Sequence, residues 1–435
     1  MLALATSEAP HSRIDEDTVI RLTNPIQRYA WGSTTAIPEL LGLPATSEPM
    51  AESWMGAHPS APSLVTTEDG ETGLDQLIAA DARALMGPHA VGRFGGELPY
   101  LLKIIAADSP LSLQVHPDIE QARRGYTAEE AAGVPIDARH RNYRDSNHKP
   151  ELIYALTPFE ALCGFRAPRR AAELLGGLDA PLAKQLGDLL TAQPSYEGIR
   201  AVFTRLLEPG TRPKPDNVRQ VAEACAARLA HGSPSPHADR TVVLLANAYP
   251  GDPGVVTSLL LNAVTLRPGE AMFVPTGAVH AYLHGMGVEV MASSDNVLRA
   301  GLTPKHVDVA ELLRTVDYVP APPIRIAPEV FHCASEVFHE ATSVFRAPVD
   351  DFELSVTSVD DDLVHPLPGG GPRILLCLDG GLTIATSGDI TIALSKGESL
   401  FASASDGELT ARGRGTVIQA DVPLGRHQPM KERHV

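Results

Sequence analysis

Apolar residues recur along this chain with two different spacings, one in the middle of the sequence and another on either side of it. Between about residues 168 and 248 they fall three or four positions apart, as in Val218, Val221 and Cys225, which predicts helices with one buried face. On both sides, short apolar runs broken by proline and glycine predict strands. The pattern therefore predicts a mainly β protein with an inserted α-helical subdomain.

The individual elements follow from the same spacings. Strands are predicted near residues 99–105, 111–116, 258–266, 271–277, 280–285 and 288–296, with turns between the last four. Helices are predicted at 74–87, 119–133, 167–177, 180–192, 196–207, 215–232 and 241–251. Residues 232–239, rich in proline and serine, predict a link between the last two helices.

A chain of 435 residues is too long for one ordinary domain, and the changes of pattern suggest where it divides. Residues 18–165 and 251–335 are predicted to form the two parts of one β domain. Residues 166–250 are predicted to form the helical subdomain between them. A proline-rich link near 319–329 leads to a C-terminal β unit, predicted at 336–424.

Glycine, proline and histidine recur at a characteristic spacing in the second part of the β domain. Five residues separate Gly269 from Pro275, and four separate Pro275 from His280. This resembles the second half of the cupin signature, in which the glycine turns one strand, the proline ends it, and the histidine opens the next strand toward the barrel interior. The resemblance implies a cupin-like β-barrel, with His280 facing its interior.

A weaker echo of this pattern lies in the C-terminal unit. Gly397 begins it in the same way, but Ser403 stands where the proline would fall and Glu408 where the histidine would fall. The C-terminal unit is therefore expected to be a second cupin-like barrel that has lost its metal. The predicted architecture is thus two cupin-like β-barrels, a metal-binding N-terminal one and a metal-free C-terminal one.

Charge and cysteine content restrict the partners and the compartment. The formal net charge of −17 argues against nucleic acid and anionic membranes, because both would be repelled, and any phosphorylated ligand would need a local basic pocket. The four cysteines show no paired spacing, which suits a reducing compartment. The N-terminal residues lack a secretory signal pattern, and no apolar run is long enough to cross a bilayer, so a cytoplasmic location is predicted.

One short segment carries candidate metal ligands. Residues 111–116 alternate strictly, so Ser112, Gln114 and His116 should share one face of a strand, where residues two apart lie roughly 7 Å apart. Beside His280 and the nearby acid Glu151, these residues predict a site of two imidazoles, one carboxylate and one amide oxygen. Such a mixed N/O set suits Zn²⁺, with manganese, iron or cobalt possible.

Longer motifs around these residues resemble one enzyme family. Residues 143–151 and 280–305 resemble the two signature segments of type I mannose-6-phosphate isomerase, and residues 29–33, 111–118 and 249–254 agree with that family in the same order. The resemblance runs from about residue 22 to about residue 320. It implies a zinc enzyme that interconverts mannose 6-phosphate and fructose 6-phosphate, with a role in carbohydrate metabolism and GDP-mannose biosynthesis. The implied metal ligands are Gln114, His116, Glu151 and His280, and the implied catalytic arginine is Arg299.

Aldose–ketose isomerisation moves a proton between C1 and C2 through an enediolate, so it needs a base, a group that stabilises oxygen charge, and a grip on the phosphate. Glu289, which alternates with two valines, and Lys149, which should point the same way as Glu151, both qualify as the base, and the sequence does not choose between them. The remaining candidates for binding substrate or developing charge are Arg299, Lys103, Ser112, Lys305, Trp31, Tyr282 and Asp295.

Two other functions are compatible with a cupin fold. A cupin dioxygenase would use a redox metal and would need no phosphate pocket, so the lysines and Arg299 count against it. A non-catalytic sugar-binding or storage cupin would have no reason to keep four ligands together with acid, base and arginine. A phosphorylated hexose is therefore the expected partner, bound by a monomer, with no nucleic acid and no membrane.

Overall fold

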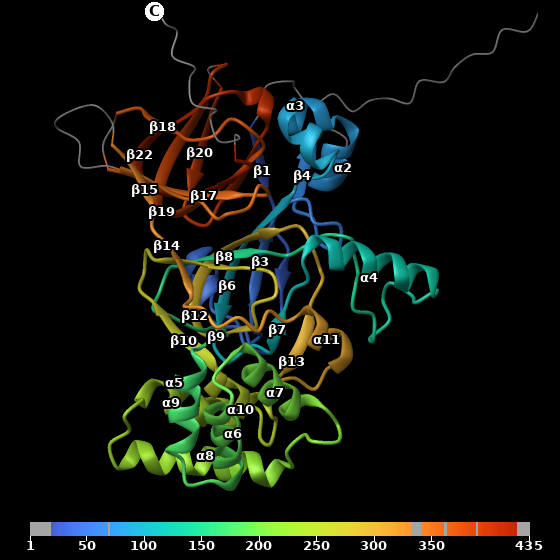
Figure 1. The fold of residues 1–435 in the computed structure, drawn as a ribbon. Helices are drawn as coiled ribbons and strands as arrows, with labels where there is room; N and C mark the ends of the chain where they lie inside the picture. The colour runs from blue at the N-terminus through green and yellow to red at the C-terminus, as the bar shows by residue number, and fades with distance from the viewer. Residues whose placement is uncertain (1–18, 68–69, 333–340, 361–362, 389, 424–435) are drawn as a thin grey trace, which may run out of the picture.

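The computed structural model describes residues 19–67, 70–332, 341–360, 363–388 and 390–423. Both chain termini, Cys333 and the predicted domain boundaries at residues 18, 336 and 424 lie outside these ranges. Figure 1 shows three regions stacked along the long axis of the molecule: a helical region at the bottom, a β region in the middle and a second β region at the top. The protein is thus mainly β with a helical subdomain, as the hydrophobic pattern predicts.

The middle region is built on an eleven-stranded sheet, called here the middle sheet, in which all recorded neighbours are antiparallel. Its main path runs in the order β14 (Ile324–Ile326), β11 (Ala271–Val274), β8 (Glu151–Ala155), β12 (His280–Ala292), β6 (Tyr100–Ala107), β3 (Glu52–Met55) and β2 (Ile26–Gln27). Off this path lie β7 (Leu113–Val115), β9 (Phe159–Phe165), β10 (Leu261–Leu266) and β13 (Leu298–Gly301). The long strand β12 pairs with four others and holds the sheet together.

The top region is built on a nine-stranded antiparallel sheet, called here the upper sheet. Its main path is β1 (Ile20–Leu22), β21 (Ser399–Ala402), β19 (Arg373–Thr386), β22 (Leu409–Asp421), β17 (Glu353–Val359), β16 (Ala341–Phe345) and β15 (Glu329–His332). The strands β18 (His365–Leu367) and β20 (Thr391–Ser395) pair off this path, and β4 (Leu64–Thr67) with β5 (Gly70–Gly73) forms a separate hairpin. Because β1 pairs with β21, the start of the described chain is tied to its end.

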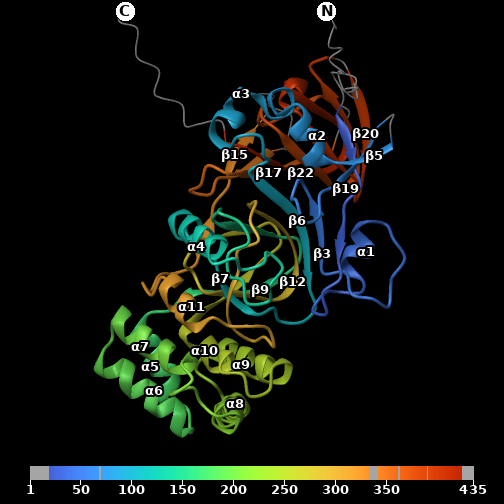
Figure 2. The ribbon, with the colours of Figure 1, turned by 90° about the vertical axis from the view of Figure 1, so that its right-hand side faces the viewer.

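The helices fall into two groups. Within and around the β regions lie α1 (Ala36–Leu40), α2 (Leu74–Ala80), α3 (Ala82–Phe94), α4 (Ile119–Ala131), α11 (Val309–Thr315) and the short turn η2 (Ala404–Asp406). The helical subdomain contains α5 (Pro168–Gly176), α6 (Pro181–Ala192), α7 (Tyr196–Leu207), α8 (Pro215–Ala230) and α9 (Pro236–Ala248), followed by α10 (Gly254–Thr257) and η1 (Ser258–Leu260). Figure 2 shows α4 and α11 together along one side of the middle region.

The helical stripes of the sequence are buried where the pattern predicts. Val218, Val221 and Cys225 of α8 are fully buried, in a core that also takes in residues of the middle sheet such as Val115 and Leu298. The predicted link at 232–239 is present but shorter, because α8 ends at Ala230 and α9 already begins at Pro236. Proline is favoured at the first position of a helix, where its missing N–H would have no partner in any case.

Three further predicted elements differ from the structure. The single helix at 74–87 is two helices, because Asp81 ends α2 and caps α3 by accepting a hydrogen bond from the Ala84 N–H. The two strands at 280–285 and 288–296 are one strand, β12, in which Gly285 at φ +117° takes up the bend. The strand at 111–116 is shorter than predicted, because β7 covers only three residues.

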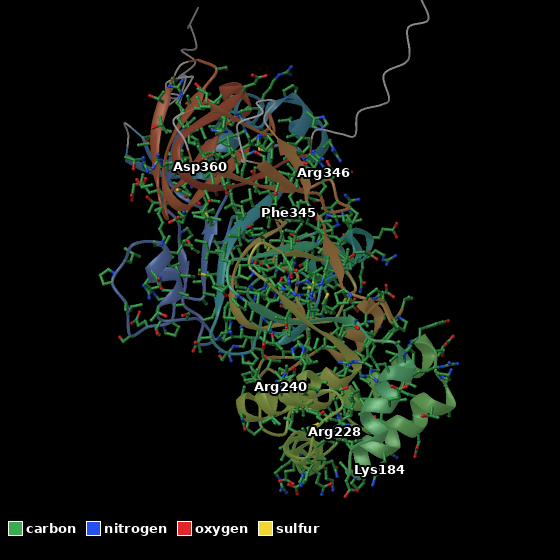
Figure 3. The ribbon with its side chains drawn as sticks, turned by 90° about the vertical axis from the view of Figure 1, so that its left-hand side faces the viewer. Lys184, Arg228, Arg240, Phe345, Arg346 and Asp360 are labelled. Carbon is green, nitrogen blue, oxygen red and sulfur yellow. The ribbon has the colours of Figure 1, made fainter. Side chains whose placement is uncertain are left out.

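The two sheets are joined by a shared apolar core. Tyr100 and Leu102 of the middle sheet belong to the same buried cluster as Ile374 and Ile418 of the upper sheet. Phe345, labelled in Figure 3 near the level where the two β regions meet, makes an edge contact with Tyr154 at 5.3 Å between ring centroids. The upper sheet therefore packs against the middle sheet as one hydrophobic body.

Several smaller predictions can be compared with the described chain. Gly269 has φ +89° and Gly397 has φ +82°, the left-handed conformation that a turning glycine supplies before β11 and before β21. Cys163, Cys225 and Cys377 are buried and free. Among the described residues, no helix combines the length and hydropathy needed to span a bilayer.

Candidate metal centre and active site

Three side chains that are distant in sequence meet in the middle sheet. One ligand atom from each of His116, Glu151 and His280 lies within 4.8 Å of the others, and all three side chains are buried. His116 follows β7 directly, Glu151 is the first residue of β8, and His280 is the first residue of β12. The strand ends thus bring together three of the four ligands proposed from the sequence.

Gln114, the fourth proposed ligand, lies beside this cluster by strand register. It is the ladder partner of His280 on one side and of Arg299 on the other. Residues directly opposite each other on one face of an antiparallel pair have their Cβ atoms about 5 Å apart. The register therefore places Gln114 between the histidine and the arginine.

The hydrogen bonds of the two imidazoles suit metal binding. The Nδ1 atom of His116 lies 2.7 Å from the Asn296 carbonyl oxygen, and that of His280 lies 3.0 Å from the Ala278 carbonyl oxygen. A carbonyl can only accept, so each Nδ1 carries the proton and each Nε2 presents a lone pair. Both Nε2 atoms are buried and have no hydrogen-bond partner in the described part of the chain, which is the arrangement a metal ion would satisfy.

Electrostatics agree with this assignment. Burial lowers the pKa of His116 to about 4, so its imidazole is neutral near pH 7 and can act as a ligand. The two Nε2 atoms lie 3.1 Å and 3.4 Å from the two oxygens of Glu151, although their directions make no hydrogen bond. Two imidazole nitrogens facing a carboxylate form an N/O donor set typical of zinc.

Lys149 lies beside the metal cluster. Its Nζ atom is 3.6 Å from Glu151 Oε1, so the two side chains point the same way, as expected for residues on either side of Pro150. Lys149 is only 8% exposed, which places its ammonium group inside the site rather than in solvent. It can therefore reach a ligand bound next to Glu151.

Glu289 is also buried, and it lies beyond Tyr282 as seen from the metal cluster. Its Oε1 accepts a hydrogen bond from the Tyr282 hydroxyl at 2.8 Å, and its Oε2 lies 3.2 Å from Lys103 Nζ. The Tyr282 hydroxyl is also 3.4 Å from Glu151 Oε2, so it links Glu289 to the metal cluster. Burial, followed by repulsion from Glu151, raises the pKa of Glu289.

Lys103 is the cation beside Glu289. It is the ladder partner of Glu289 on one strand and of Trp54 on the other, and its Nζ lies 5.2 Å from the Trp54 ring centroid. Burial alone would lower the pKa of Lys103, but Glu52 and Glu289 raise it above its ordinary value. Lys103 is therefore a buried, charged partner of Glu289, which agrees with its position in an apolar strand of the sequence.

The other predicted residues lie around the outer part of the site. Arg299 is half-buried on β13, opposite Gln114, and Lys305 is exposed in the loop that follows. Ser112 precedes β7 and is partly buried. Trp31 stacks on Tyr29 with 5.6 Å between ring centroids and packs against the apolar cluster around Tyr282.

Asn296 is an organising residue that the sequence interpretation missed. Its Nδ2 donates to the Asp145 and Asn147 carbonyls, and its Oδ1 accepts from the Arg144 N–H. Its own carbonyl oxygen accepts from the His116 Nδ1–H. Asn296 thus clamps the loop before Glu151 to the loop before β13, and its place inside one signature segment was the only sequence signal for it.

Asp295 faces a large cleft. Its backbone N–H donates to Asp145 Oδ2, and its Oδ1 lies 3.6 Å from His58 Nε2. The cleft has a volume of about 890 Å³ and runs between α3, α4, the loops at 58–60 and 144–148, and residues 350–351. A hexose phosphate is small enough to enter such a space.

This arrangement can bind a metal ion, hold an anion near cationic side chains, and exchange a proton with a bound ligand. Such a combination suits chemistry on a carbonyl carbon whose oxygen gains charge. Lys103, Glu289 and Tyr282 form a buried polar layer next to the metal cluster, while Arg299 is half-buried and Lys305 is exposed.

Comparisons with known proteins point to one family. The family described as phosphomannose isomerase type I, catalytic domain, matches residues 19–168. The chain is 39% identical to mannose-6-phosphate isomerase of Escherichia coli (strain K12) over 404 residues, which covers 92% of this chain and 98% of that protein. It is 31% identical to mannose-6-phosphate isomerase of Homo sapiens over 411 residues, which covers 89% of this chain and 94% of that protein.

Solved structures give the same result. A zinc-bound crystal structure of mannose 6-phosphate isomerase matches with a TM-score of 0.82 and 37% identity, covering 93% of this chain and all (100%) of that one. A structure of a phosphomannose isomerase mutant from Salmonella typhimurium matches with a TM-score of 0.82 and 36% identity, with the same coverage. The resemblance read from the sequence motifs is confirmed.

Proposed function

Because this chain belongs to the type I phosphomannose isomerase family, we propose that it interconverts mannose 6-phosphate and fructose 6-phosphate. The observation that carries this proposal is the buried cluster of His116, Glu151 and His280, with two unpartnered Nε2 atoms and cationic side chains nearby. Relatives matched over about nine-tenths of the chain carry this enzyme's name.

The cofactor is one zinc ion per chain, held by His116, Glu151 and His280, with Gln114 as the fourth ligand. Solved relatives are described as zinc-bound, and the donor atoms present here suit that metal. When bound, the ion supplies a Lewis acid that polarises an oxygen of the sugar. Because His116 and His280 donate their Nδ1 protons to backbone carbonyls, their rings are already oriented before the ion binds.

Proton transfer between C1 and C2, through an enediolate, is assigned to one of two groups. Glu289 has one oxygen bound by Tyr282 and the other facing Lys103, so it has less freedom to accept a proton from substrate. Lys149 lies next to Glu151 at the metal cluster. This placement favours Lys149 as the group that exchanges the proton, with Glu289 holding Lys103 in position.

Arg299 is assigned to the developing oxygen charge. It lies opposite Gln114 in the ladder, next to the proposed ligand set, and its guanidinium can bind two oxygens at once. Ser112, Trp31, Tyr282 and Asp295 are assigned to the walls that position the sugar.

Further proposals concern the architecture of the protein, its oligomeric state and its place in the cell. We infer that each large sheet derives from a cupin-like barrel, although the recorded strand pairings describe open paths. The enzyme is proposed to act as a cytoplasmic monomer that supports GDP-mannose biosynthesis.

The decisive experiment is a coupled assay with purified protein loaded with zinc. Mannose 6-phosphate should be converted to fructose 6-phosphate, and dialysis against a strong chelator should abolish turnover until zinc is restored. Oxygen consumption by an iron-loaded, coloured protein would favour the dioxygenase. Sugar binding without turnover in the zinc form would favour the storage cupin.

A further inference from the structure

Three neighbouring cationic side chains have no partner among the residues that the structure describes. Arg144 and Lys305 are exposed and Arg299 is half-buried, and none of their side chains makes an ion pair or hydrogen bond to another described residue. Arg299 and Lys305 were candidates from the sequence. Arg144 was not, because it occupies an unremarkable position within the first signature segment.

Several other arginines of this protein are paired with acids. Arg141, Arg228 and Arg346 each contact at least one carboxylate. With 53 acidic against 36 basic residues, carboxylates are abundant in the chain. Arg144, Arg299 and Lys305 instead lie close enough to repel one another, with no carboxylate partner among the described residues. The energetic cost of grouping three cations in this way points to an anionic ligand.

The backbone brings Arg144 to the other two cations. Its N–H donates to Asn296 Oδ1 at 2.8 Å, and Asn296 lies three positions before Arg299. Lys305 follows in the loop after β13, the strand that carries Arg299. The Asn296 clamp thus ties the loop of Arg144 to the segment of the other two residues.

The three charges also act on one another. Partial burial lowers the pKa of the otherwise exposed Lys305 first, and the neighbouring charges of Arg299 and Arg144 lower it further. Burial lowers the pKa of Arg299 as well, and Arg144 is the next contributor. Repulsion among the three groups is therefore present in the ligand-free protein, and a bound dianion would relieve it.

The three residues differ in how deeply they are buried. Arg299 is opposite Gln114, beside the metal cluster, while Arg144 and Lys305 are exposed further out. Arg144 also lines the 890 Å³ cleft together with Asp295. A sugar with its reacting carbons near the metal cluster would extend its far end toward Arg144 and Lys305.

Building on the proposed function, we propose that Arg144 is a specificity-determining residue that binds the substrate's phosphate together with Lys305. Arg299 lies between this anion site and the reacting carbons. The guanidinium of Arg144 can contact two phosphate oxygens at once, whereas Lys305 offers a point charge. The pair selects sugar phosphates over unphosphorylated sugars.

The test compares Arg144→Ala with a matched control, Arg123→Ala, in the zinc-loaded protein at low ionic strength. Arg123 is an exposed arginine on α4 that lines the same cleft. Thermal unfolding is followed with and without inorganic phosphate. Arg144→Ala should raise the melting temperature of the ligand-free protein, because repulsion is relieved, and should reduce the stabilisation by phosphate. Arg123→Ala should change neither.

Kinetics give a second, independent measurement. Arg144→Ala should raise KM for mannose 6-phosphate by roughly tenfold or more with kcat nearly unchanged, because a charged hydrogen bond made equally in ground and transition states is lost. Arg144→Lys should recover part of the loss. An unchanged phosphate stabilisation in Arg144→Ala would overturn the proposal, as would a lower melting temperature with a matching loss of kcat.

The outcomes separate this proposal from the proposed function. If the wild-type protein binds phosphate in an Arg144-dependent way but does not isomerise mannose 6-phosphate, the anion site stands and the enzymatic assignment fails. If the wild-type protein isomerises the sugar and Arg144→Ala behaves like Arg123→Ala, the enzymatic assignment stands and the role of Arg144 is refuted.

Discussion

At the scale of single residues, orientation decides the chemistry. In both His116 and His280, the Nδ1–H group donates a hydrogen bond to a backbone carbonyl, which leaves Nε2 to face the other ligands. The sequence shows that two histidines are present, but only the carbonyls of Asn296 and Ala278 select the ring nitrogen that is free. The metal site is thus built by hydrogen bonds outside the ligand set as much as by the ligands.

Replacing one of these histidines should empty the site. His280→Ala removes one of the proposed ligands, and the remaining donors should not hold zinc after dialysis. Elemental analysis is expected to fall from one zinc per chain to nearly none, with activity lost in parallel. The exposed His140→Ala serves as control and should keep both. Full activity of a demonstrably zinc-free His280→Ala protein would refute the assignment.

Replacing Arg299 and replacing Lys305 should change the steady-state kinetics in different ways. If Arg299 binds the oxygen charge that develops during reaction, Arg299→Ala should lower kcat by about a hundredfold or more with a modest change in KM. Lys305→Ala should mainly raise KM, because its contact to phosphate is the same before and during reaction. Steady-state kinetics on both variants decide this, and the reverse pattern would exchange the two roles.

At the scale of elements, a buried ion pair links three helices of the helical subdomain in addition to their apolar core. Arg228 of α8 donates from Nε to Asp239 of α9 at 2.8 Å and from Nη1 to the Leu174 carbonyl of α5. Asp239 is fully buried, and Ser233 donates to it as well. One arginine therefore connects three helices; Figure 3 labels it at the bottom of the molecule.

Removing the acid should destabilise this subdomain without touching the chemistry. Asp239→Ala leaves the partly buried Arg228 uncompensated, which typically costs about 3–5 kcal/mol. Urea unfolding should report this loss, while kcat of the folded protein stays near the wild-type value. Asp216→Ala, which breaks an exposed pair with Arg219, is the control and should change little. Equal stability of the two variants would contradict the stabilising role of the Arg228–Asp239 ion pair.

The C-terminal β unit has a different local structure at the positions that echo the metal motif. Ser403 stands at the proline position and caps η2, accepting from the Asp406 N–H while Asp406 accepts from the Ser403 N–H. Glu408 comes just before β22, where the histidine would open the strand. Elemental analysis should therefore give one tightly bound zinc per chain. The prediction would be contradicted if the wild-type protein held two tightly bound ions and the His280→Ala variant still held one.

At the scale of the whole molecule, a buried polar group lies where the two sheets meet. The Tyr100 hydroxyl of the middle sheet is within 3.0 Å of the Ala420 carbonyl, next to Asp421 of the upper sheet. Burial raises the pKa of Asp421 to about 7, with Arg373 opposing and Glu353 adding to the shift. The N–H groups of Gly370 and Val422 donate to its carboxyl oxygens.

This group should make folding stability depend on pH. Between about pH 4 and pH 7 the folded protein keeps a proton on Asp421 that the unfolded chain has released, so stability falls as pH rises through this window and then levels off. The side chain at position 421 cannot titrate in the Asp421→Asn variant. The free energy of unfolding of the wild type should therefore fall relative to that of the variant as pH rises through the same window. Denaturant unfolding at several pH values measures the difference. A difference that is constant from pH 4 to pH 8 would refute the assignment.

The sequence by itself determined much of this protein. Spacing of apolar residues predicted the helical subdomain, because a helix must bury one face whatever its neighbours are. Three ligands and the family were also readable, since the two signature segments are contiguous stretches of chain. Glycine positions at 269 and 397 predicted turns, because only a residue without a side chain adopts that backbone conformation easily.

Only the tertiary structure decided the rest, and the physical reason is that these features depend on partners distant in the chain. Lys103 is a buried partner of Glu289 because strand register sets them opposite each other, 186 positions apart in sequence. Asn296 and Arg144 became visible only when two loops were brought together. The continuity of β12 and the start of α9 likewise follow from packing and capping, which hydrophobic periodicity does not encode.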